Sequence, residues 1–548
     1  MTDNTQYDIQ EILENYFSTT QQTSFLANVQ TILPFRLAIS QNKNNKKPIN
    51  SSTVSEKLSK TVEFSSGRKR KGAYYTPADV VDYTVHNVIH NYLTNSNEVL
   101  PVSVIKKQCY DKNKLLHLCT QKTFLDPTCG AGSFLLSTLE SKLFFLKTIK
   151  QDNSANILKV IQTIFGNDID ANAVLVSKLR ILFYLQEHHY QISSQIIQAI
   201  NNNFSTYNFI FDAMPNNCKY NFIIGNPPYI EYRSLDEKPK TKYGNVYADV
   251  LHNTNNHLKP NSSIAYIVPI SFCATPRMKN IRNEELNSFS NNIVLSFADR
   301  PDSLFSSVHQ KINIIFGLNF NSNSTHNLYT SQYNCWYKDE RQQLFERLSV
   351  VKNDDYNNFA IPKYGDILQK NIYKKVTNTS NTSLLDLLTK NQTTPSNNSI
   401  YLAKRNFTYI KCFLNNPKSN EYDCYDVVQL PAKTMLAILS STLFWMYWTI
   451  YSDGWHLTNK ELSTFTIPTI NNQISKQLTN LADELLQRLE ETKVYVGTVQ
   501  TDYEYKHKEA LDILDKIDGV LGTVYQLAPQ EIHYIKNYAR KYRGGVVK

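Results

Sequence analysis

Glycine is scarce in this sequence. It accounts for 15 of 548 residues, where an average composition of roughly 7% would give about 38. In such a chain, a glycine is expected where the backbone tolerates no side chain. Apolar residues make up 41% of the chain and charged residues 19%, a balance that excludes a disordered tail and a protein embedded in a membrane. The length suffices for roughly two to four domains.

The sequence also lacks paired cysteines. Its eight cysteines are scattered, with none in a Cys-x-x-Cys pair. This predicts neither a zinc site nor the disulfide framework of a small secreted domain, and no bound metal is expected. The N-terminal residues lack the basic and apolar regions of a signal peptide. The predicted location is a reducing cytoplasm, close to the nucleoid of a prokaryote.

Residues 434–452 contain no charged residue, as membrane spans do. Six of these 19 residues are serine or threonine, which face lipid poorly. We predict a buried helix followed by a strand, and no association with a membrane.

Positive charge is concentrated near the N-terminus. Lysine and arginine (58) exceed aspartate and glutamate (48) by ten. Residues 41–71 hold nine basic residues against Glu56 and Glu63, so about +7 of this excess lies in one polar connector. The connector ends in Arg68, Lys69, Arg70 and Lys71. These four cations are predicted to contact nucleic-acid phosphates, and the alternative is a solvated linker.

Between residues 72 and 320, short apolar segments alternate with amphipathic ones. This rhythm predicts an α/β fold with a doubly wound, Rossmann-like, largely parallel sheet. The last two strands are separated by a short loop, which predicts an antiparallel hairpin at the sheet edge. The predicted strands are 123–127, 163–168, 207–211, 220–226, 264–269, 293–298 and 312–318.

The remaining segments differ in pattern. Residues 1–40 have helical spacing, residues 330–470 have short apolar segments without a clear period, and residues 471–548 return to strong helical spacing. We predict a helical extension with the basic connector (1–71), the α/β domain (72–330), an α+β domain (331–470) and a C-terminal helical hairpin (471–548).

The motif DPTCGAGSF (126–134) stands between a predicted strand and a predicted helix. Gly130 and Gly132 would let a ligand lie against the backbone at the positive end of that helix. The spacing matches neither a dinucleotide nor an ATP-binding loop, and Asp126 suits a cationic ligand. When this motif stands alone, an ordinary tight turn is the alternative.

Two carboxylates follow the next predicted strands. Asp168, in GNDID (166–170), stands where an acidic residue accepts hydrogen bonds from ribose hydroxyls. Asp212 follows the predicted strand 207–211, where it could accept a hydrogen bond from an adenine amino group. Each is weak evidence by itself.

The motif GNPPY (225–229) follows a further predicted strand. Pro227 and Pro228 fix the backbone and remove two N–H donors, so the peptide carbonyls and the Asn226 amide oxygen form a rigid set of acceptors. A planar exocyclic amine needs such acceptors, and Tyr229 offers a face on which a base can stack. A structural loop cap is the alternative.

In this order, GAYYTP (72–77), DPTCGAGSF, GNDID and GNPPY resemble the motifs of N6-adenine DNA methyltransferases from restriction–modification systems, most of all the long type IIG-like enzymes. Five of the 15 glycines fall in these four motifs. The resemblance is strong over residues 70–320 and weaker over 425–543, where it extends to those families' specificity regions. It implies a methyl transfer from S-adenosyl-L-methionine to an adenine rotated out of double-stranded DNA, with a target-recognition domain at 331–470.

The resemblance also implies roles for single residues. For the cofactor, Thr76 would contact the methionine moiety, Asp126 and Thr128 would line its amino-acid end, and Asp168 would bind the ribose. Ile169 would pack on the cofactor adenine, with Asp212 accepting from its amino group, and Gly130 and Gly132 would form the turn. For the target, Asn226, Pro227 and Pro228 would orient the amine, Tyr229 would stack on the base, and Phe305 would close the sandwich unless it is plain core.

Two features differ from related families. No P-D…(D/E)-x-K nuclease pattern stands out before the first motif, so no DNA cleavage is predicted for this chain. No Pro-Cys dipeptide of the 5-methylcytosine enzymes occurs either. Three alternatives stay open: an RNA or protein-glutamine methyltransferase, a catalytically silent DNA-binding subunit, and a modification subunit that needs a separate specificity or restriction subunit. The oligomeric state is not predicted.

Overall fold

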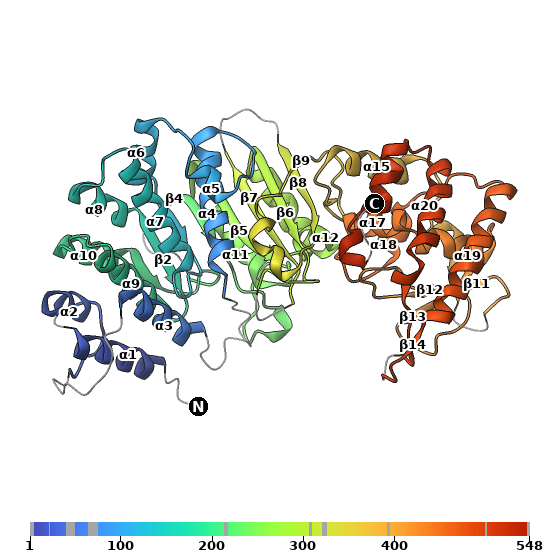
Figure 1. The fold of residues 1–548 in the computed structure, drawn as a ribbon. Coiled ribbons are helices and arrows are strands. Elements are labelled where there is room, and N and C mark those ends of the chain that lie inside the picture. The colour runs from blue at the N-terminus through green and yellow to red at the C-terminus, as the bar shows by residue number, and fades with distance from the viewer. Residues whose placement is uncertain are drawn as a thin grey trace. The chain divides into compact units, whose positions relative to one another are not determined.

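The computed structural model describes residues 5–20, 22–39, 50–63, 75–212, 218–305, 309–319, 326–391, 395–498 and 501–544. The chain divides into two compact units. The first comprises residues 1–269, 277–294 and 304–329, and the second comprises 270–276, 295–303 and 330–548. Each unit is described by itself below (Figure 1).

A nine-stranded sheet has the order β3-β2-β1-β4-β5-β7-β6-β8-β9. The pairs β1–β2, β2–β3, β1–β4 and β4–β5 are parallel, and β7 pairs antiparallel with β5. The predicted α/β fold with a largely parallel sheet is thus confirmed. The strands are β1 (Phe124–Asp126), β2 (Ile164–Asp168), β3 (Phe204–Thr206), β4 (Tyr220–Gly225), β5 (Leu258–Pro269), β6 (Asn291–Phe297), β7 (Ile312–Leu318), β8 (Asn327–Asn334) and β9 (Val351–Lys352).

Helices connect and cover the parallel strands. Helix α7 packs against β1 and β2, α9 packs against β2 and β3, and α3 packs against α9. The first unit contains α1 (Thr5–Thr19), α2 (Thr23–Gln30), α3 (Ser51–Glu63), α4 (Ala78–Thr94), α5 (Val102–Ile105), α6 (Lys112–Gln121), α7 (Ser133–Thr148), α8 (Ser154–Gln162), α9 (Ala171–Glu187), α10 (Ser194–Asn203), α11 (Val246–Asn255) and α13 (Lys279–Ser288).

The predicted connector contains helix α3. Val54, Leu58 and Val62 of α3 recur every four residues and are buried, so one apolar stripe packs on the neighbouring helices while the polar residues that suggested a linker occupy the other faces. Residues 41–49 and 64–71, including Arg68, Lys69, Arg70 and Lys71, lie outside the described residues.

The strand predicted at 207–211 is wrong, because β3 ends at Thr206. The next residues form a turn in which Asn208 N donates to Asp212 Oδ2 at 2.7 Å and Asp212 N donates to Asn208 O at 2.9 Å. Asparagine and aspartate side chains favour such local bonds over a strand ladder.

The hairpin predicted at 293–318 consists of the neighbouring strands β6 and β7, but it is not at the sheet edge. In the sheet, β8 and β9 follow β6. The residues after 326 that supply β8 did not show a clear strand period, because half-buried and buried positions do not alternate regularly along it.

The second unit combines helices with a small antiparallel sheet of order β10-β13-β11-β12, as an α+β region was predicted to do. Its strands are β10 (Leu388–Lys390), β11 (Ser399–Ala403), β12 (Cys412–Phe413) and β13 (Tyr422–Val427), with a separate pair β14 (Val494–Tyr495) and β15 (Tyr503–Glu504). Its helices are α12 (Ser271–Ala274), α14 (Arg341–Leu344), α15 (Ile367–Asn378), α16 (Ala432–Ser440), α17 (Thr442–Tyr451), α18 (Asn459–Thr464), α19 (Asn472–Thr492), α20 (Leu511–Val524) and α21 (Pro529–Asn537).

One hydrophobic core runs through this unit. It joins side chains of the four-stranded sheet to those of α16, α17, α19 and α20, and α19 packs against α20 as the predicted helical hairpin requires. The uncharged segment 434–452 forms two buried helices, not a helix and a strand. A helix that is apolar on all sides is stable when the core surrounds it. Within the described residues, no helix is both long and apolar enough to cross a membrane.

Lys142 of α7 lies in the core of the first unit with no exposed surface. Its Nζ donates to Lys122 O at 2.8 Å and to Thr163 Oγ1 at 2.6 Å, and lies 4.6 Å from the centroid of the Phe124 ring. Burial lowers the pKa of this amine from 10.5 to about 7. The side chain is therefore a pH-sensitive element of the fold.

We expect Lys142 to make the chain more stable as the pH rises above about 7. Between the folded and unfolded pKa values, the unfolded chain holds a proton that the folded chain lacks, so each pH unit adds up to about 1.4 kcal/mol to the free energy of unfolding. Denaturant titrations near about pH 7.5 and about pH 9 measure this slope. Lys142→Met should flatten it, whereas Lys57→Met, at an exposed position of α3, should not. Equal slopes in all three proteins would contradict the assignment.

Candidate active site

Two motifs meet where the strand order reverses. Strands β1 and β4 are parallel neighbours, with Phe124 opposite Phe222 and Leu125 opposite Ile223. Their carboxyl ends, Asp126 and Gly225, therefore lie at the same edge of the sheet. In parallel α/β sheets this switch point is where ligands bind.

The contact between Asp126 and Gly225 is close. A Cβ atom on Gly225 would stand 2.7 Å from Asp126 Oδ1, so glycine is required at this position. Asp126 is buried, with 1% of its surface exposed, and it accepts a hydrogen bond from Thr128 N at 3.0 Å. Burial, reinforced by the nearby charge of Asp168, raises the pKa of this carboxyl well above its usual range. A cationic group at this point would stabilise the carboxylate.

The glycine turn after β1 is held by polar contacts. Gly130 and Gly132 have φ of +52° and +79°, values that glycine adopts without strain. Asp168 Oδ2 accepts from Gly130 N at 2.8 Å, and its Oδ1 accepts from Asp170 N at 2.9 Å. At Gly132, a Cβ atom would stand 2.7 Å from Ser177 Oγ. The turn thus packs tightly on α9, and these contacts fix its backbone at the start of α7.

Asn167 connects the motif loops, and the sequence analysis did not single it out. Its Nδ2 donates to Pro127 O at 3.0 Å and to Tyr207 O at 3.1 Å, and its backbone oxygen accepts from Cys129 N at 2.7 Å. Asn167 is 1% exposed. An asparagine inside a buried strand was the available signal, because a buried amide needs partners.

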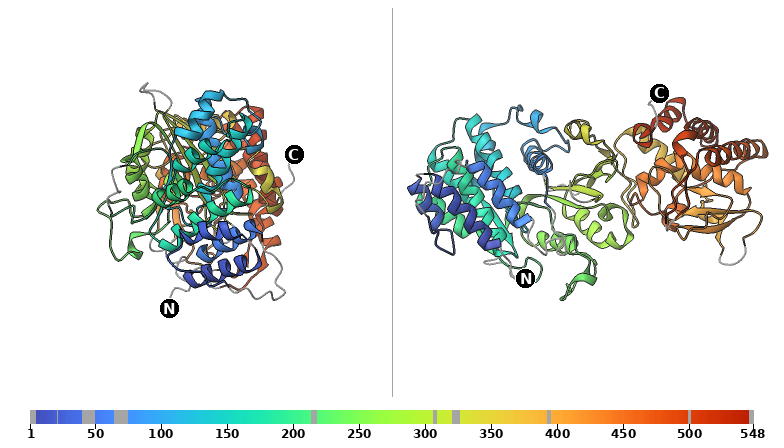
Figure 2. Two further views of the ribbon diagram at one scale, coloured as in Figure 1. Left: turned by 90° about the vertical axis from the view of Figure 1, so that its left-hand side faces the viewer. Right: turned by 60° about the horizontal axis from the view of Figure 1, so that its bottom comes forward.

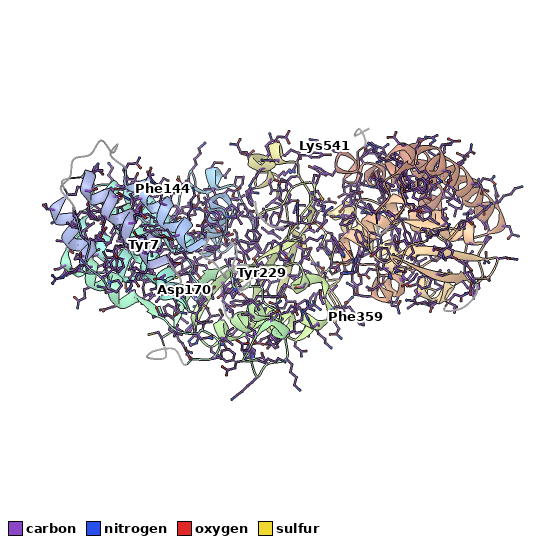
Figure 3. The ribbon with its side chains drawn as sticks, turned by 90° about the horizontal axis from the view of Figure 1, so that it is seen from below. Tyr7, Phe144, Asp170, Tyr229, Phe359 and Lys541 are labelled. Atoms are coloured by element: carbon purple, nitrogen blue, oxygen red, sulfur yellow. The ribbon has the colours of Figure 1, made fainter. Side chains whose placement is uncertain are left out.

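Asn226 is held from both sides. Its Nδ2 donates to Thr76 Oγ1 at 3.0 Å, and its Oδ1 accepts from Tyr229 OH at 2.6 Å. Tyr229 OH also lies 3.0 Å from Ile267 O, and its ring meets Tyr247 edge to face at 6.3 Å. Figure 3 marks the position of Tyr229. Pro227 is buried, whereas Pro228 and Tyr229 are partly exposed. The motif is therefore rigid, and it links residue 76 to the end of β4.

Thr128 has a buried hydroxyl group and Ile169 an exposed apolar side chain, and neither is typical of a well-packed core. Thr128 Oγ1 is buried, and no described residue provides its hydrogen-bond partner. Ile169 is 62% exposed directly after β2. A buried hydroxyl without a partner and an exposed apolar side chain beside the glycine turn fit a bound ligand with polar and planar parts.

Asp212 and Phe305 stand differently from the other predicted residues. Asp212 is exposed and accepts from Asn208 N within its own turn. Phe305 is 2% exposed, which matches the alternative of a core residue as well as a closed aromatic pocket. The described contacts link Thr76 and Tyr229 to Asn226, Thr128 and Gly225 to Asp126, and Gly130 to Asp168.

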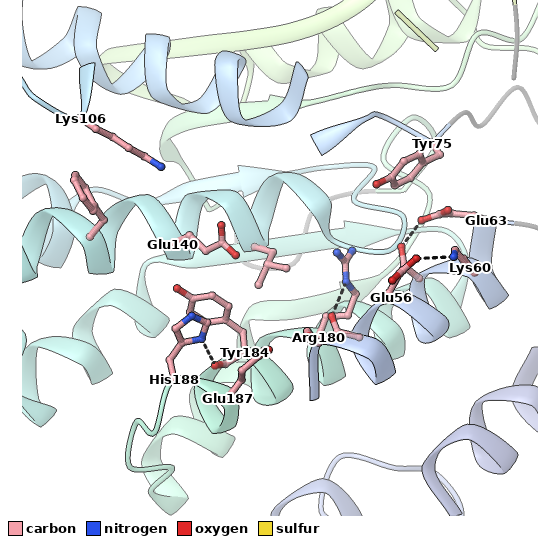
Figure 4. Close-up of a pocket in the computed structure, with 15 residues that line it drawn as sticks. Glu56, Lys60, Glu63, Tyr75, Lys106, Glu140, Arg180, Tyr184, Glu187 and His188 are labelled. Carbon is pink, nitrogen blue, oxygen red and sulfur yellow. Dashed lines mark hydrogen bonds and ion pairs between the residues drawn. The ribbon is translucent and has the colours of Figure 1, made fainter. Parts of the chain in front are cut away.

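A cavity of about 760 Å³ lies behind the glycine turn and is lined mainly by α3, α7 and α9 (Figure 4). Among its polar residues, Glu56 and Lys60 form an ion pair at 2.6 Å, and burial raises the pKa of Glu140. None of the predicted catalytic or cofactor residues lines this cavity. Arg180 does, and its guanidinium donates to Ala131 O at 2.6 Å, so this residue braces the turn from the cavity side.

Part of the sequence is similar to known proteins. Residues 162–303 match the model of the Eco57I restriction-modification methylase family. A protein of Methanocaldococcus jannaschii, RM.MjaORFECS2P, named as a type II restriction enzyme and methyltransferase, is 29% identical over 161 residues. That match covers 25% of this chain and 14% of the relative, so the chain spans only a small part of the length of that curated protein.

Two solved structures match this chain, and the first of them is similar in fold. The type IIL restriction-modification enzyme MmeI in complex with DNA has a TM-score of 0.52 at 13% identity, over 99% of this chain and 91% of MmeI. The ATP-dependent type ISP restriction-modification enzyme LlaBIII bound to DNA has a TM-score of 0.48 at 11% identity, over 88% of this chain and 45% of LlaBIII.

The matched segment begins just before β2 and contains both GNDID and GNPPY. The resemblance predicted from the motifs is confirmed at this level: residues 162–303 match the model of the Eco57I restriction-modification methylase family.

Proposed function

We propose that the protein is a site-specific DNA adenine N6-methyltransferase of a restriction–modification system. The observation that carries the proposal is the fixed orientation of Asn226. Because Thr76 and Tyr229 hold both ends of its amide, the oxygen of Asn226 is preorganised as an acceptor at the switch point of the sheet.

The target amine would be bound by this acceptor and by carbonyl groups of the motif. An exocyclic amine of adenine delocalises its lone pair into the ring, and acceptors on both N–H bonds favour the pyramidal, nucleophilic nitrogen. An amide oxygen has two lone pairs, so Asn226 Oδ1 could accept from the target amine as well as from Tyr229 OH. Tyr229 would present its ring to the base, with Phe305 as the proposed second aromatic. The adenine must leave the duplex to reach this site.

S-adenosyl-L-methionine is the proposed cofactor, and when bound it supplies an electrophilic methyl group. The donor set fits it: Asp126 suits the ammonium group, the Thr128 hydroxyl needs a partner, and Ile169 exposes an apolar surface. Asp168 would bind the ribose hydroxyls, and Asp212 would need to move out of its turn to reach an adenine.

Double-stranded DNA is the proposed partner, in part because MmeI is described in complex with DNA. The second unit would supply sequence recognition. A modification subunit with a separate specificity subunit is the main alternative. A silent subunit is disfavoured because Asn226 and both glycines of the turn are present and ordered.

Expression in a host that lacks adenine methylation, followed by genome-wide mapping of modified bases, tests the proposal. The expected result is N6-methyladenine at one short motif, absent from cells that express Asn226→Ala. Modification of RNA or protein without DNA would redirect the substrate assignment, and no modified DNA motif would contradict an enzyme that acts alone.

Asp168→Ala is expected to weaken binding of the cofactor by roughly 1.5–3 kcal/mol, the range for hydrogen bonds to a charged group. The change also removes the anchor of the Gly130 amide. Calorimetry with S-adenosyl-L-methionine measures the effect, and DNA affinity without cofactor should barely change. Asp170→Ala is measured alongside it, because Asp170 caps α9 through Asn172 N and is the other carboxylate of the motif. Unaltered cofactor affinity in Asp168→Ala would refute the ribose assignment and make Asp170 the next candidate.

The proposed phosphate contacts of Arg68, Lys69, Arg70 and Lys71 are tested by changing all four to glutamine. Binding to every DNA sequence should weaken about equally, because phosphate contacts position a protein without reading bases. The slope of log K against log salt should become shallower by up to about 3.6 if all four engage. An unchanged slope would identify the segment as a solvated linker.

A further inference from the structure

The chain forms a closed loop directly after the GNPPY motif, and we call residues 231–245 the post-motif loop. Its two ends are joined: Glu231 and Asn245 form an antiparallel bridge, and Val246 N donates to Ile230 O at 2.9 Å. The Asn245 side chain also donates to Glu231 Oε1 at 3.1 Å. The segment projects from the sheet in the right-hand view of Figure 2. The loop therefore starts and ends at one fixed place.

Further contacts brace the base of this loop. Arg277 donates to both carboxylate oxygens of Glu231, at 2.9 and 2.8 Å. Tyr232 OH donates to both oxygens of Asp249, at 2.8 and 2.7 Å, and Thr241 donates to the same carboxylate. Glu231 and Arg277 thus form an ion pair with each other, and two hydroxyl groups bind the Asp249 carboxylate.

The outer part of the loop carries exposed positive charges. Lys238, Lys240 and Lys242 are exposed, as is Arg233. Within the described residues, none of the three lysines forms an ion pair. Asp236 and Glu237 are also exposed on the loop, so four cations face two carboxylates and an excess of two positive charges remains.

The position of these cations follows from the chain itself. Arg233 is four residues after Tyr229, and four extended residues span at most about 14 Å. Phosphates along one DNA strand repeat about every 3.4 Å of helix axis. A base held at Tyr229 would thus bring several phosphates of its own strand within reach of the loop.

We propose that the post-motif loop binds the DNA backbone beside the target adenine, with Lys238, Lys240 and Lys242 contacting phosphates. The proposal rests on the proposed function and adds a contact surface to it. Because the base is braced, the loop loses little conformational freedom on binding. Its lysines would hold the strand whose base is rotated out, without reading the sequence.

The test is the variant Lys238→Gln/Lys240→Gln/Lys242→Gln in the full chain. The probe is a DNA duplex of about 20 base pairs. Changing Lys147, Lys150 and Lys159 to glutamine is the matched control. All three lysines are exposed. Lys147 lies at the end of α7 that is remote from the glycine turn, Lys150 follows that helix, and Lys159 lies on α8. Both variants remove three positive charges from the first unit, so they separate a local contact from an effect of net charge.

In the loop variant, the slope of log K against log salt should become shallower by up to about 2.7, and the KM for DNA should rise. The rate of methyl transfer at saturating DNA and the affinity for S-adenosyl-L-methionine should stay within about threefold of wild type, because these lysines touch neither group. The control variant should keep the wild-type slope to within about 0.5.

A wild-type slope in the loop variant would overturn the proposal and leave the proposed function intact, as would an equal loss in both variants. A wild-type chain that fails to bind duplex DNA would overturn both. If binding to DNA is unchanged while binding to a partner protein is lost, the loop is a protein-contact surface instead.

Discussion

Replacing Asn226 with alanine is expected to lower the rate of methyl transfer by about 10³-fold or more, the scale for loss of a preorganised electrostatic group. We expect no nearby side chain to replace the amide oxygen as an acceptor, because Thr76 and Tyr229 orient it. Single-turnover transfer to DNA at saturating cofactor measures the effect. Cofactor affinity should remain close to that of wild type, since the predicted cofactor contacts of Asp126 and Asp168 are retained.

Asn202→Ala is the matched control for this experiment. Asn202 is an exposed asparagine at the end of α10, and its replacement should leave transfer unchanged. Transfer within tenfold of wild type in Asn226→Ala would rule out the assigned role. Loss of cofactor binding together with transfer would instead assign Asn226 to the cofactor pocket.

Gly225→Ala is expected to damage both halves of the site with one methyl group. The new Cβ would stand 2.7 Å from Asp126 Oδ1 and 3.2 Å from its Cγ. Overpacking of this kind costs about 1–3 kcal/mol of stability, and a shift of about 1 Å at reacting groups costs about 10²-fold in rate. We expect weaker cofactor binding and at least that loss of transfer, measured by calorimetry and single-turnover kinetics.

Gly519→Ala serves as the control because an added Cβ there meets only Lys536 Nζ, at 3.7 Å. Gly519 lies within α20, where alanine is the better helix former by about 1 kcal/mol. The control should melt at or above the wild-type temperature with unchanged transfer. A Gly225→Ala enzyme with wild-type cofactor affinity and rate would show that Asp126 does not need its present position.

The sequence predicted the motif loops well because their signals are local. Strands β1, β2 and β4 are short apolar runs that end in Asp126, Asp168 and Gly225, and a break in hydrophobicity at glycine, proline or aspartate marks such an end. The same local approach failed for the strand predicted at 207–211, because this apolar run has a strand-like composition. There, bonds between Asn208 and Asp212 form a turn, and periodicity alone cannot weigh them.

By itself, the sequence determined the α/β class, the order of the motifs and the residue types available for chemistry, since each depends on neighbours along the chain. Only the tertiary structure decided how they combine. The order of strands places Asp126 beside Gly225, about a hundred residues later in the chain, and it lets Asn167 of β2 join the segments that follow β1 and β3. It also sets Arg180 of α9 against Ala131. Such contacts follow from which strands pair and how helices pack across them, and the free energy of that choice is spread over the whole core and not over any one motif.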